Sequence, residues 1–184
     1  MILIGWCGRI YLKNKSKKRG KGMKLEIRHG RVEDLEECFR LEGKTFPEEE
    51  AASKENIEVR LSKFSEGFIV GKVEGRIVAH INSGSTNKDD ITDEGFKGLV
   101  GHEPCGENIV IFSVAVDPEY QNRGVATLMM RKFIEVSRGM GKKKVLLLCK
   151  ENLMKMYEGM GYKKIGKSTS THGGASWYEM EYTL

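Results

Sequence analysis

One strand–turn–helix segment, residues 109–139, constrains the fold of this chain more than any other. Residues 109–116 are typical of a buried strand, Asp117 and Pro118 of a turn, and residues 123–139 of an amphipathic helix. Gly124 and the small Ala126 stand where the helix begins, so a ligand can approach the backbone closely. The N–H groups of a first helical turn and the helix dipole both favour an anion there, and Arg123 adds a cation. The segment is therefore suited to hold a phosphate group.

The motif Gln121-x-x-Gly124-x-Ala126 resembles the coenzyme A pyrophosphate loop of the GCN5-related N-acetyltransferases. A short glycine motif alone is weak evidence, but the strand before it, the Val-Asp-Pro-Glu-Tyr turn and the helix after it make it specific. The alternative is an ordinary strand–turn–helix of an α/β domain. The resemblance implies that the pyrophosphate is held by Gln121, Asn122, Arg123, Gly124, Val125, Ala126 and Thr127.

The remaining sequence alternates between strand and helix patterns. Strands are predicted at 25–29, 67–73, 76–83, 109–116, 144–149, 162–165 and 176–183, and helices at 32–42, from 53, at 123–139 and at 152–159. Glu74-Gly75 is a favoured hairpin turn, and the apolar run at 145–148 indicates a strand covered on both faces. This order fits the acetyltransferase family from about residue 25 to 184. The resemblance implies an α/β (α+β) fold with a mixed, mostly antiparallel central sheet of about seven strands and about four flanking helices.

Composition agrees with one soluble domain that has a sizeable core. The chain has 184 residues, of which 39% are hydrophobic and 31% charged. No apolar run approaches the roughly 18–20 residues that span a bilayer, so no membrane partner is expected. The four cysteines show neither CxxC spacing nor close pairing with histidine: Cys7, Cys38, Cys105 and Cys149. They are predicted to be reduced thiols of a cytoplasmic protein that binds no metal.

The N-terminus differs from the rest of the chain. Residues 13–24 form a basic, glycine-containing run, which we interpret as a solvated tail rather than a surface for nucleic acid or anionic membrane. Nucleic acid is not an expected partner, since the remainder has no basic stripe with interleaved aromatics. We predict a flexible extension at residues 1–22 and an N-acetyltransferase domain at residues 23–184. Met23 is an alternative natural start, and both a monomer and a homodimer remain open.

Three further strings are similar to the arylalkylamine (serotonin-type) branch of the family. They are TFPEEEAAS at 45–53, LCKEN at 148–152 with MYEGMGY at 156–162, and WYEM at 177–180. The first string is the most specific to the branch. The resemblance implies direct transfer of an acetyl group from acetyl-CoA to a primary amine, with a small arylalkylamine as the first expectation. The alternatives are a protein or peptide N-acetyltransferase and a catalytically weak acetyl-CoA-binding module.

The resemblance also assigns chemical roles to residues of the coenzyme side. Tyr157 matches the tyrosine near the coenzyme sulfur, and its phenol could donate a proton to the departing thiolate. The alternative is a buried structural tyrosine. Asn152 is expected either to touch the pantetheine arm or to cap a helix. The thioester oxygen is expected to meet the backbone of Val114, Ala115 and Val116.

One departure from the branch concerns the base. Its vertebrate members carry two histidines, one residue apart, where this chain has Val110 and Phe112, and neither of these can accept a proton. The loop that lines the amine site in the family instead carries three carboxylates, Glu48, Glu49 and Glu50. They could hold a cationic amine or take its proton, or they could form an exposed acidic turn that stabilises the next helix.

From this loop and its surroundings we predict Glu49 and Glu50, with Tyr157, as the catalytic candidates. The predicted amine-binding residues are Phe46, Pro47, Glu48, Phe112 and Leu148. His80, His102 and His172 are weaker candidates, because a lone histidine is more often structural. His172 is slightly favoured since it lies in the predicted last hairpin, near the amine side.

Overall fold

The computed structural model describes residues 7–12 and 23–184. The strands are β1 (Cys7–Leu12), β2 (Met23–His29), β3 (Ile69–Val73), β4 (Arg76–Thr86), β5 (Asn108–Val116), β6 (Lys144–Cys149), β7 (Lys163–Lys167) and β8 (Tyr178–Thr183). The α-helices are α1 (Leu35–Thr45), α2 (Lys54–Lys63), α3 (Val125–Gly139) and α4 (Met154–Glu158). Short 3-10 turns join them, of which η3 (Glu94–Gly98) and η5 (Glu151–Leu153) matter below.

The described strands form one sheet in the order β1-β2-β3-β4-β5-β6-β8-β7. Every neighbouring pair is antiparallel except β5 and β6, which run parallel. The predicted mixed, mostly antiparallel sheet and the four helices are therefore confirmed. The helix predicted from residue 123 begins two residues later, at Val125, because Gly124 takes a left-handed conformation and stands before the first turn.

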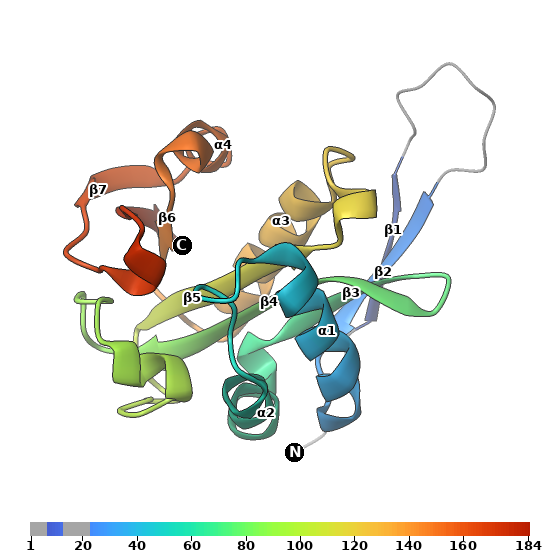
Figure 1. Cartoon of the computed structure of the whole chain (residues 1–184), viewed down its shortest axis with the longest axis horizontal. Helices are drawn as coiled ribbons and strands as arrows, with labels where there is room; N and C mark the ends of the chain where they lie inside the picture. The colour runs from blue at the N-terminus through green and yellow to red at the C-terminus, as the bar shows by residue number, and fades with distance from the viewer. Residues whose placement is uncertain (1–6, 13–22) are drawn as a thin grey trace.

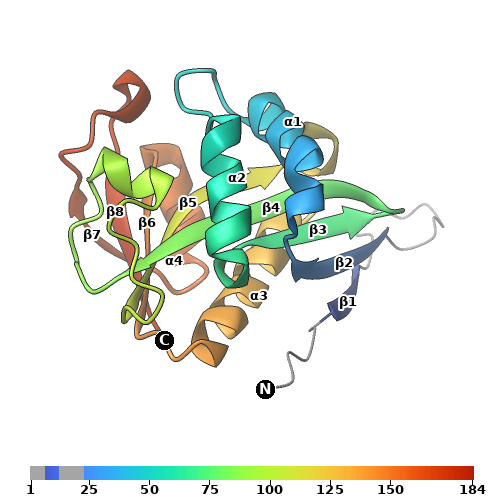
Figure 2. The same ribbon diagram turned by 90° about the horizontal axis from the view of Figure 1, so that it is seen from below.

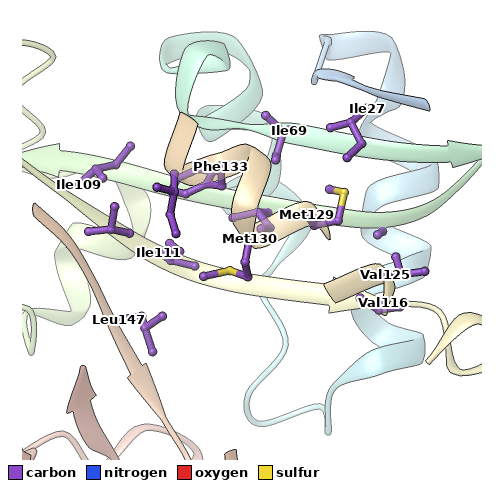
Figure 3. Close-up of a cluster of buried hydrophobic side chains, with 14 of the residues drawn as sticks. Ile27, Ile69, Ile109, Ile111, Val116, Val125, Met129, Met130, Phe133 and Leu147 are labelled. Atoms are coloured by element: carbon purple, nitrogen blue, oxygen red, sulfur yellow. The ribbon is translucent and has the colours of Figure 1, made fainter. Parts of the chain in front are cut away.

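Helices cover both faces of this sheet. Figures 1 and 2 show α1 and α2 side by side on one face and α3 on the opposite face. The larger core lies under α3, where Met129, Met130 and Phe133 pack on strand residues such as Ile69 and Ile111 (Figure 3). A second core joins α1 and α2 to the sheet through Cys38, Leu41, Ile57, Leu61, Phe68 and Val70. The sheet is thus the middle of three layers, and its central strands are buried on both faces.

Two local predictions are met by clear backbone features. The β3–β4 hairpin turns at Glu74 and Gly75, which have φ values of 50° and 82°, as a two-residue hairpin turn with two positive φ angles requires. Ser53 caps α2, since its Oγ accepts a hydrogen bond from the backbone N–H of Asn56 at 3.2 Å. Both features come from residues that the sequence alone singles out.

The strand β1 lies within residues 1–22, where the sequence analysis predicts a flexible extension and no strand. Residues 7–12 pair with β2 over the register Cys7↔Arg28 to Leu12↔Met23, so β1 forms the edge of the sheet. The pairing rests on main-chain groups of an exposed sheet edge, which a prediction from side-chain pattern does not capture. The domain boundary at residue 23 stays a prediction.

The parallel pair in the middle of the sheet is short and opens into a fork. The pairing of β5 with β6 extends only from Asn108↔Lys144 to Ile111↔Leu147. Beyond Ile111, β5 continues to Val116 beside β4, whereas β6 continues to Cys149 beside β8. The two strands therefore diverge at residue 112 and leave a gap between them.

Candidate active site

A cavity of about 400 Å³ lies where β5 and β6 diverge. Segments distant in the sequence surround it: the end of α1 with the loop at 46–52, α2, the η3 region, β5, the end of β6, and residues 172–177. Of the residues predicted for the site, the cavity is lined by Phe46, Pro47, Glu50, Phe112, Val114, Leu148 and Tyr157. The fold thus brings together residues that the sequence separates by more than a hundred positions.

One wall of the cavity is apolar and aromatic. Phe112 packs edge-on against Phe96, with ring centroids 5.2 Å apart, and its own ring lies 4.7 Å from the guanidinium carbon of Arg60. Phe46 and Leu148 continue this wall. Trp177 closes it from the C-terminal segment, where its Nε1 donates to the carbonyl oxygen of His172 at 2.9 Å. Such a wall suits the body of an apolar or aromatic ligand.

The predicted phosphate loop follows β5 and is open to solvent. Residues 121–124 are exposed, and Asn122 and Gly124 have φ values of 57° and 81°, so successive backbone N–H groups turn outward before α3 begins. The first turn of α3 contains no acidic residue. A Cβ built on Gly124 would have no heavy atom within 4 Å apart from its two chain neighbours, so the space at this glycine is open. These features fit a pyrophosphate group.

Gln121 and Val125 take supporting places in this loop. The Nε2 of Gln121 donates to the carbonyl oxygen of Val116 at 2.9 Å, which ties the loop to the end of β5. Val125 is 1% exposed and packs in the core under α3. Arg123 lies near the ring of Tyr120, at 5.7 Å from its centroid. The ligand-facing groups of the loop are therefore backbone N–H groups together with the exposed side chains of Asn122 and Arg123.

The backbone of β5 alternates in direction, and this separates the three strand residues predicted to face a thioester. The N–H of Asp117 donates to the carbonyl oxygen of Val78 on β4 at 2.9 Å. Because N–H direction alternates along a strand, the N–H of Ala115 also points to β4, where it pairs with His80. The N–H groups of Val114 and Val116 then point to the open side. Of the two, Val114 also lines the cavity.

Tyr157 lies at the cavity with 5% of its surface exposed. Its ring packs edge-on against Tyr162, with centroids 5.6 Å apart. Burial raises the pKa of the phenol, and the neighbouring Cys149 acts in the same direction. The group is therefore protonated throughout the neutral range, so it carries a proton that a departing thiolate could accept.

The structure separates the three acidic loop residues. Glu50 lines the cavity with a side chain 9% exposed, and its Oε1 lies 2.5 Å from the Nζ of Lys150. Glu48 and Glu49 are exposed and are not among the residues that line the cavity. The N–H groups of Glu50 and Ala51 donate to the carbonyl oxygen of Pro47 and close a turn at 47–51. Of the three acidic residues, only Glu50 lines the cavity.

Asn152 also lies apart from the cavity. It is exposed within η5, where the residue before the turn is Lys150, and Leu153 precedes α4 without a side-chain cap. The helix-capping alternative is therefore wrong for this residue, because it stands inside the turn instead of in front of a helix. Contact with a pantetheine arm stays a prediction.

The three histidines occupy different environments. His172 lines the cavity, and its Nε2 lies 3.3 Å from the carbonyl oxygen of Glu50. His102 packs on Phe64 outside the cavity and accepts a hydrogen bond from the N–H of Ser85, while burial lowers its pKa. His80 is fully buried on β4 and stacks with Phe68 at 5.5 Å.

A buried polar chain beside the cavity was missed by the sequence analysis. Glu42 on α1 is 2% exposed, lines the cavity, and lies with its Oε2 3.1 Å from His80 Nε2, without the alignment of a good hydrogen bond. Ser113 Oγ donates to the same oxygen at 2.8 Å, and the N–H of Ala52 donates to Oε1 at 3.2 Å. The only available signal was a lone glutamate at a helical position that otherwise faces the core.

This buried network of polar side chains continues from His80 to α2. Asn82 Nδ2 lies 3.2 Å from His80 Nδ1, and Arg60 Nη1 donates to Asn82 Oδ1 at 2.8 Å. Nε and Nη2 of Arg60 both donate to the carbonyl oxygen of Lys97. Arg60, like Glu42, lines the cavity while 2% exposed. Two side chains of opposite charge, Glu42 and Arg60, thus lie beside the cavity with His80 and Asn82 between them.

The fold and the site together define a class of protein before any relative is considered. It is an α/β protein with an anion cradle at a strand–helix turn and a second ligand cavity where two parallel strands diverge. The chain belongs to the acetyltransferase (GNAT) family, whose model matches residues 31–162. Among the described residues, no helix is both long and apolar enough to cross a membrane.

Individual relatives are distant. The chain is 26% identical over 133 residues to the probable hydrolase YhcX of Bacillus subtilis, covering 67% of this chain and 26% of YhcX. It is 24% identical over 112 residues to serotonin N-acetyltransferase of Mesocricetus auratus, covering 60% of this chain and 53% of that protein. The chain thus spans about a quarter and about half of the lengths of these relatives. The structure of the GNAT-like decarboxylase GphF in complex with isobutyryl-CoA shares the fold, with a TM-score of 0.73, 17% identity, and coverage of 85% of this chain and 98% of that one.

Proposed function

We propose that this protein transfers an acetyl group from acetyl-CoA to a primary amine, most simply a small arylalkylamine. The observation that carries the proposal is that two candidate ligand-binding sites, the cavity and the phosphate loop, lie along the same strand, β5. β5 borders the cavity at Val114 and ends at Val116, to which the phosphate loop is tied through Gln121. An acyl donor with a pyrophosphate at one end and a thioester at the other matches this arrangement.

The chain's own residues fit a coenzyme A thioester. The exposed backbone at 121–124 and the first turn of α3 suit the pyrophosphate, and the N–H of Val114 faces the open side of β5 for the thioester oxygen. GphF, which shares this fold, has been solved in complex with isobutyryl-CoA. This supports a coenzyme A thioester as the donor, and membership in the acetyltransferase family supports acetyl as the group.

The proposed reaction is direct attack of the amine on the thioester carbon. A bond forms between the amine nitrogen and the carbonyl carbon while the carbon–sulfur bond breaks. The Val114 N–H stabilises the charge on the oxygen, and Tyr157 gives its proton to the departing thiolate. The amine must lose a proton, for which Glu50 is the best-placed member of the predicted acidic triple and Glu49 the weaker one. The apolar wall at Phe46, Phe112 and Leu148 supports an arylalkyl body.

The sequence alternatives remain distinct candidates. A protein or peptide acceptor would need an open groove, whereas a binding module would need no proton donor. The serotonin N-acetyltransferase similarity, at 24% identity, supports a small amine. A cytoplasmic location, and a monomer or a homodimer, remain part of the proposal.

The proposal is tested by measuring coenzyme A release with acetyl-CoA and a panel of arylalkylamines, polyamines and peptides. We expect arylalkylamines to give the highest kcat/KM. Highest turnover with peptides would favour the protein acceptor. Release with none of them, alongside tight acetyl-CoA binding in calorimetry, would favour the binding module.

A further inference from the structure

The cavity has four carboxylates in its lining, and three of them are already engaged. Glu50 pairs with Lys150, and Glu94 pairs with Lys97 Nζ at 2.9 Å. Asp93 accepts the N–H of Gly95 at 2.8 Å and caps η3. Glu42 differs, because it is the most deeply buried of the four and its ion-pair contact among residues 23–184 is a histidine, His80.

The orientation of the His80 ring is set by Asn82 and Arg60 behind it. A guanidinium can only donate, so Asn82 must present its oxygen to Arg60 and its amide N–H to His80 Nδ1. His80 Nδ1 then faces the Asn82 amide, and Nε2 faces Glu42 Oε2 at 3.1 Å. Arg60 therefore fixes the orientation of Asn82, and Asn82 in turn fixes the edge of the His80 ring that faces Glu42.

Glu42 is consequently a buried carboxylate that stays charged. Burial alone would raise its pKa, but the contacts with His80, Ser113 and the Ala52 N–H outweigh burial and hold the pKa below its usual range. Oε2 receives Ser113 and faces His80, whereas Oε1 receives only the N–H of Ala52. Since a carboxylate oxygen offers two lone pairs, Oε1 retains one acceptor site.

A charged and buried acceptor beside a ligand cavity requires a compensating positive group. The charge of Arg60 attracts Glu42 from a distance, but its N–H groups donate to Asn82 and to the Lys97 carbonyl oxygen and not to the carboxylate. The cavity also places Glu42 beside the apolar wall that contains Phe46 and Phe112. A primary ammonium on an apolar body meets both demands.

We propose that Glu42 recognises the cationic nitrogen of the acceptor amine, and that Arg60, Asn82 and His80 form a positioning chain that holds Glu42 as the acceptor. This assignment rests on the proposed function and names a residue of that site outside the loop at 48–50. Glu50, which is neutralised by Lys150, then contributes less to the preference for a cation.

The test compares two ligands that differ only in charge. The amine that the wild-type protein acetylates best and its alcohol isostere are titrated by calorimetry into the protein bound to coenzyme A, which allows no turnover. We expect Glu42→Gln to weaken binding of the amine roughly ten- to a hundred-fold, because the substitution removes a charge-assisted hydrogen bond. The affinity for the alcohol should change by less than about threefold. Glu36→Gln, an exposed glutamate of the same helix, is the matched control and should change neither value.

If Glu42→Gln weakens the binding of amine and alcohol equally, the role of Glu42 is merely structural and the assignment is overturned. An unchanged affinity for the amine would overturn it as well. Ser113→Ala, which removes one donor to Glu42, decides the matter if Glu42→Gln does not fold. Ser113→Ala should weaken binding of the amine severalfold and leave binding of the alcohol unchanged. Equal effects on the two affinities would again overturn the assignment. A wild-type protein that acetylates no amine would instead reject the proposed function.

Discussion

Tyr157 and Cys149 face the same cavity, and burial acts on both in the same direction. Burial raises the pKa of the Cys149 thiol to about 11, with Glu158 acting the same way, and it raises the pKa of the Tyr157 phenol further. Both groups are neutral at physiological pH. For Tyr157 this preserves a proton that can be given away, whereas for Cys149 it removes the thiolate that a nucleophile would need.

Tyr157→Phe should lower kcat by roughly a hundredfold, the lower range for loss of a general acid. The fall should hold throughout pH 6 to about 9, because the raised pKa keeps the phenol protonated there. Wild-type kcat/KM should rise over the same range as the amine loses its proton. Steady-state kinetics checks both, with acetyl-CoA affinity as the control. Full activity in the variant would leave the phenol without a catalytic role.

Cys149→Ala should keep most of the wild-type turnover. Direct transfer needs no acyl-enzyme, and a thiol whose pKa is about 11 is a poor nucleophile at neutral pH. The deletion of a small buried group should cost about 1 kcal/mol of unfolding free energy. Mass spectrometry after mixing with acetyl-CoA, alongside kinetics, measures the outcome. An acetylated Cys149, or lost turnover in a folded variant, would contradict direct transfer.

The turn between β5 and α3 contains two residues in a left-handed conformation, Asn122 and Gly124, of which Gly124 directly precedes the helix. Gly124→Val should weaken acetyl-CoA binding at least tenfold, because φ is +81° and a β-branched residue would distort the N–H cradle. Gly75→Val in the β3–β4 hairpin is a matched control, since its φ is +82° and its Cβ would also meet nothing within 4 Å. Both variants should lose similar stability, and calorimetry should show lost binding only for Gly124→Val. Equal affinity in the two variants would argue against the loop.

Features that depend on neighbouring residues could be predicted from the sequence, whereas features that depend on contacts between distant residues could not. The hairpin at Glu74-Gly75 and the cap at Ser53 are local, and the sequence predicted both. Glu50 points into the cavity and its neighbours Glu48 and Glu49 do not. This difference depends on packing of Glu50 with Lys150 and with residues 172–174, a hundred or more positions away. The role of Glu42 depends on His80, Asn82 and Arg60, which lie on β4 and α2. No periodicity could connect them.

The folded protein as a whole should be most stable between about pH 5 and pH 9. Burial raises the folded-state pKa of Cys38, Tyr157 and Tyr162 above their ordinary values of 9.0 and 10.0. The stability from these neutral groups is complete below the ordinary values and is lost as the pH rises toward the folded ones. Urea unfolding at stepwise pH should therefore show a declining free energy above about pH 9.

The acid side of the same profile has the opposite cause. Burial alone would raise the pKa of Asp34 and Glu42, but their polar contacts outweigh it. These are the hydrogen bonds from Arg28 to Asp34, and for Glu42 the close contact with His80 and the hydrogen bond from Ser113. Stability from these carboxylates is present above their ordinary values of 3.8 and 4.5 and is lost as the pH falls through the lowered ones. A free energy of unfolding that stays constant from pH 3 to about 10 would contradict both assignments.

The fork between β5 and β6 gives one central strand two unlike sides. The amides of Ser113 and Ala115 point to β4, whereas those of Val114 and Val116 point into the gap. Deuterium should therefore enter this strand at every second amide, fast at the two valines and slow at their neighbours, although all four lie in the middle of the sheet. Coenzyme A thioester in excess should slow the exchange at Val114, so the same amides report whether the gap is filled.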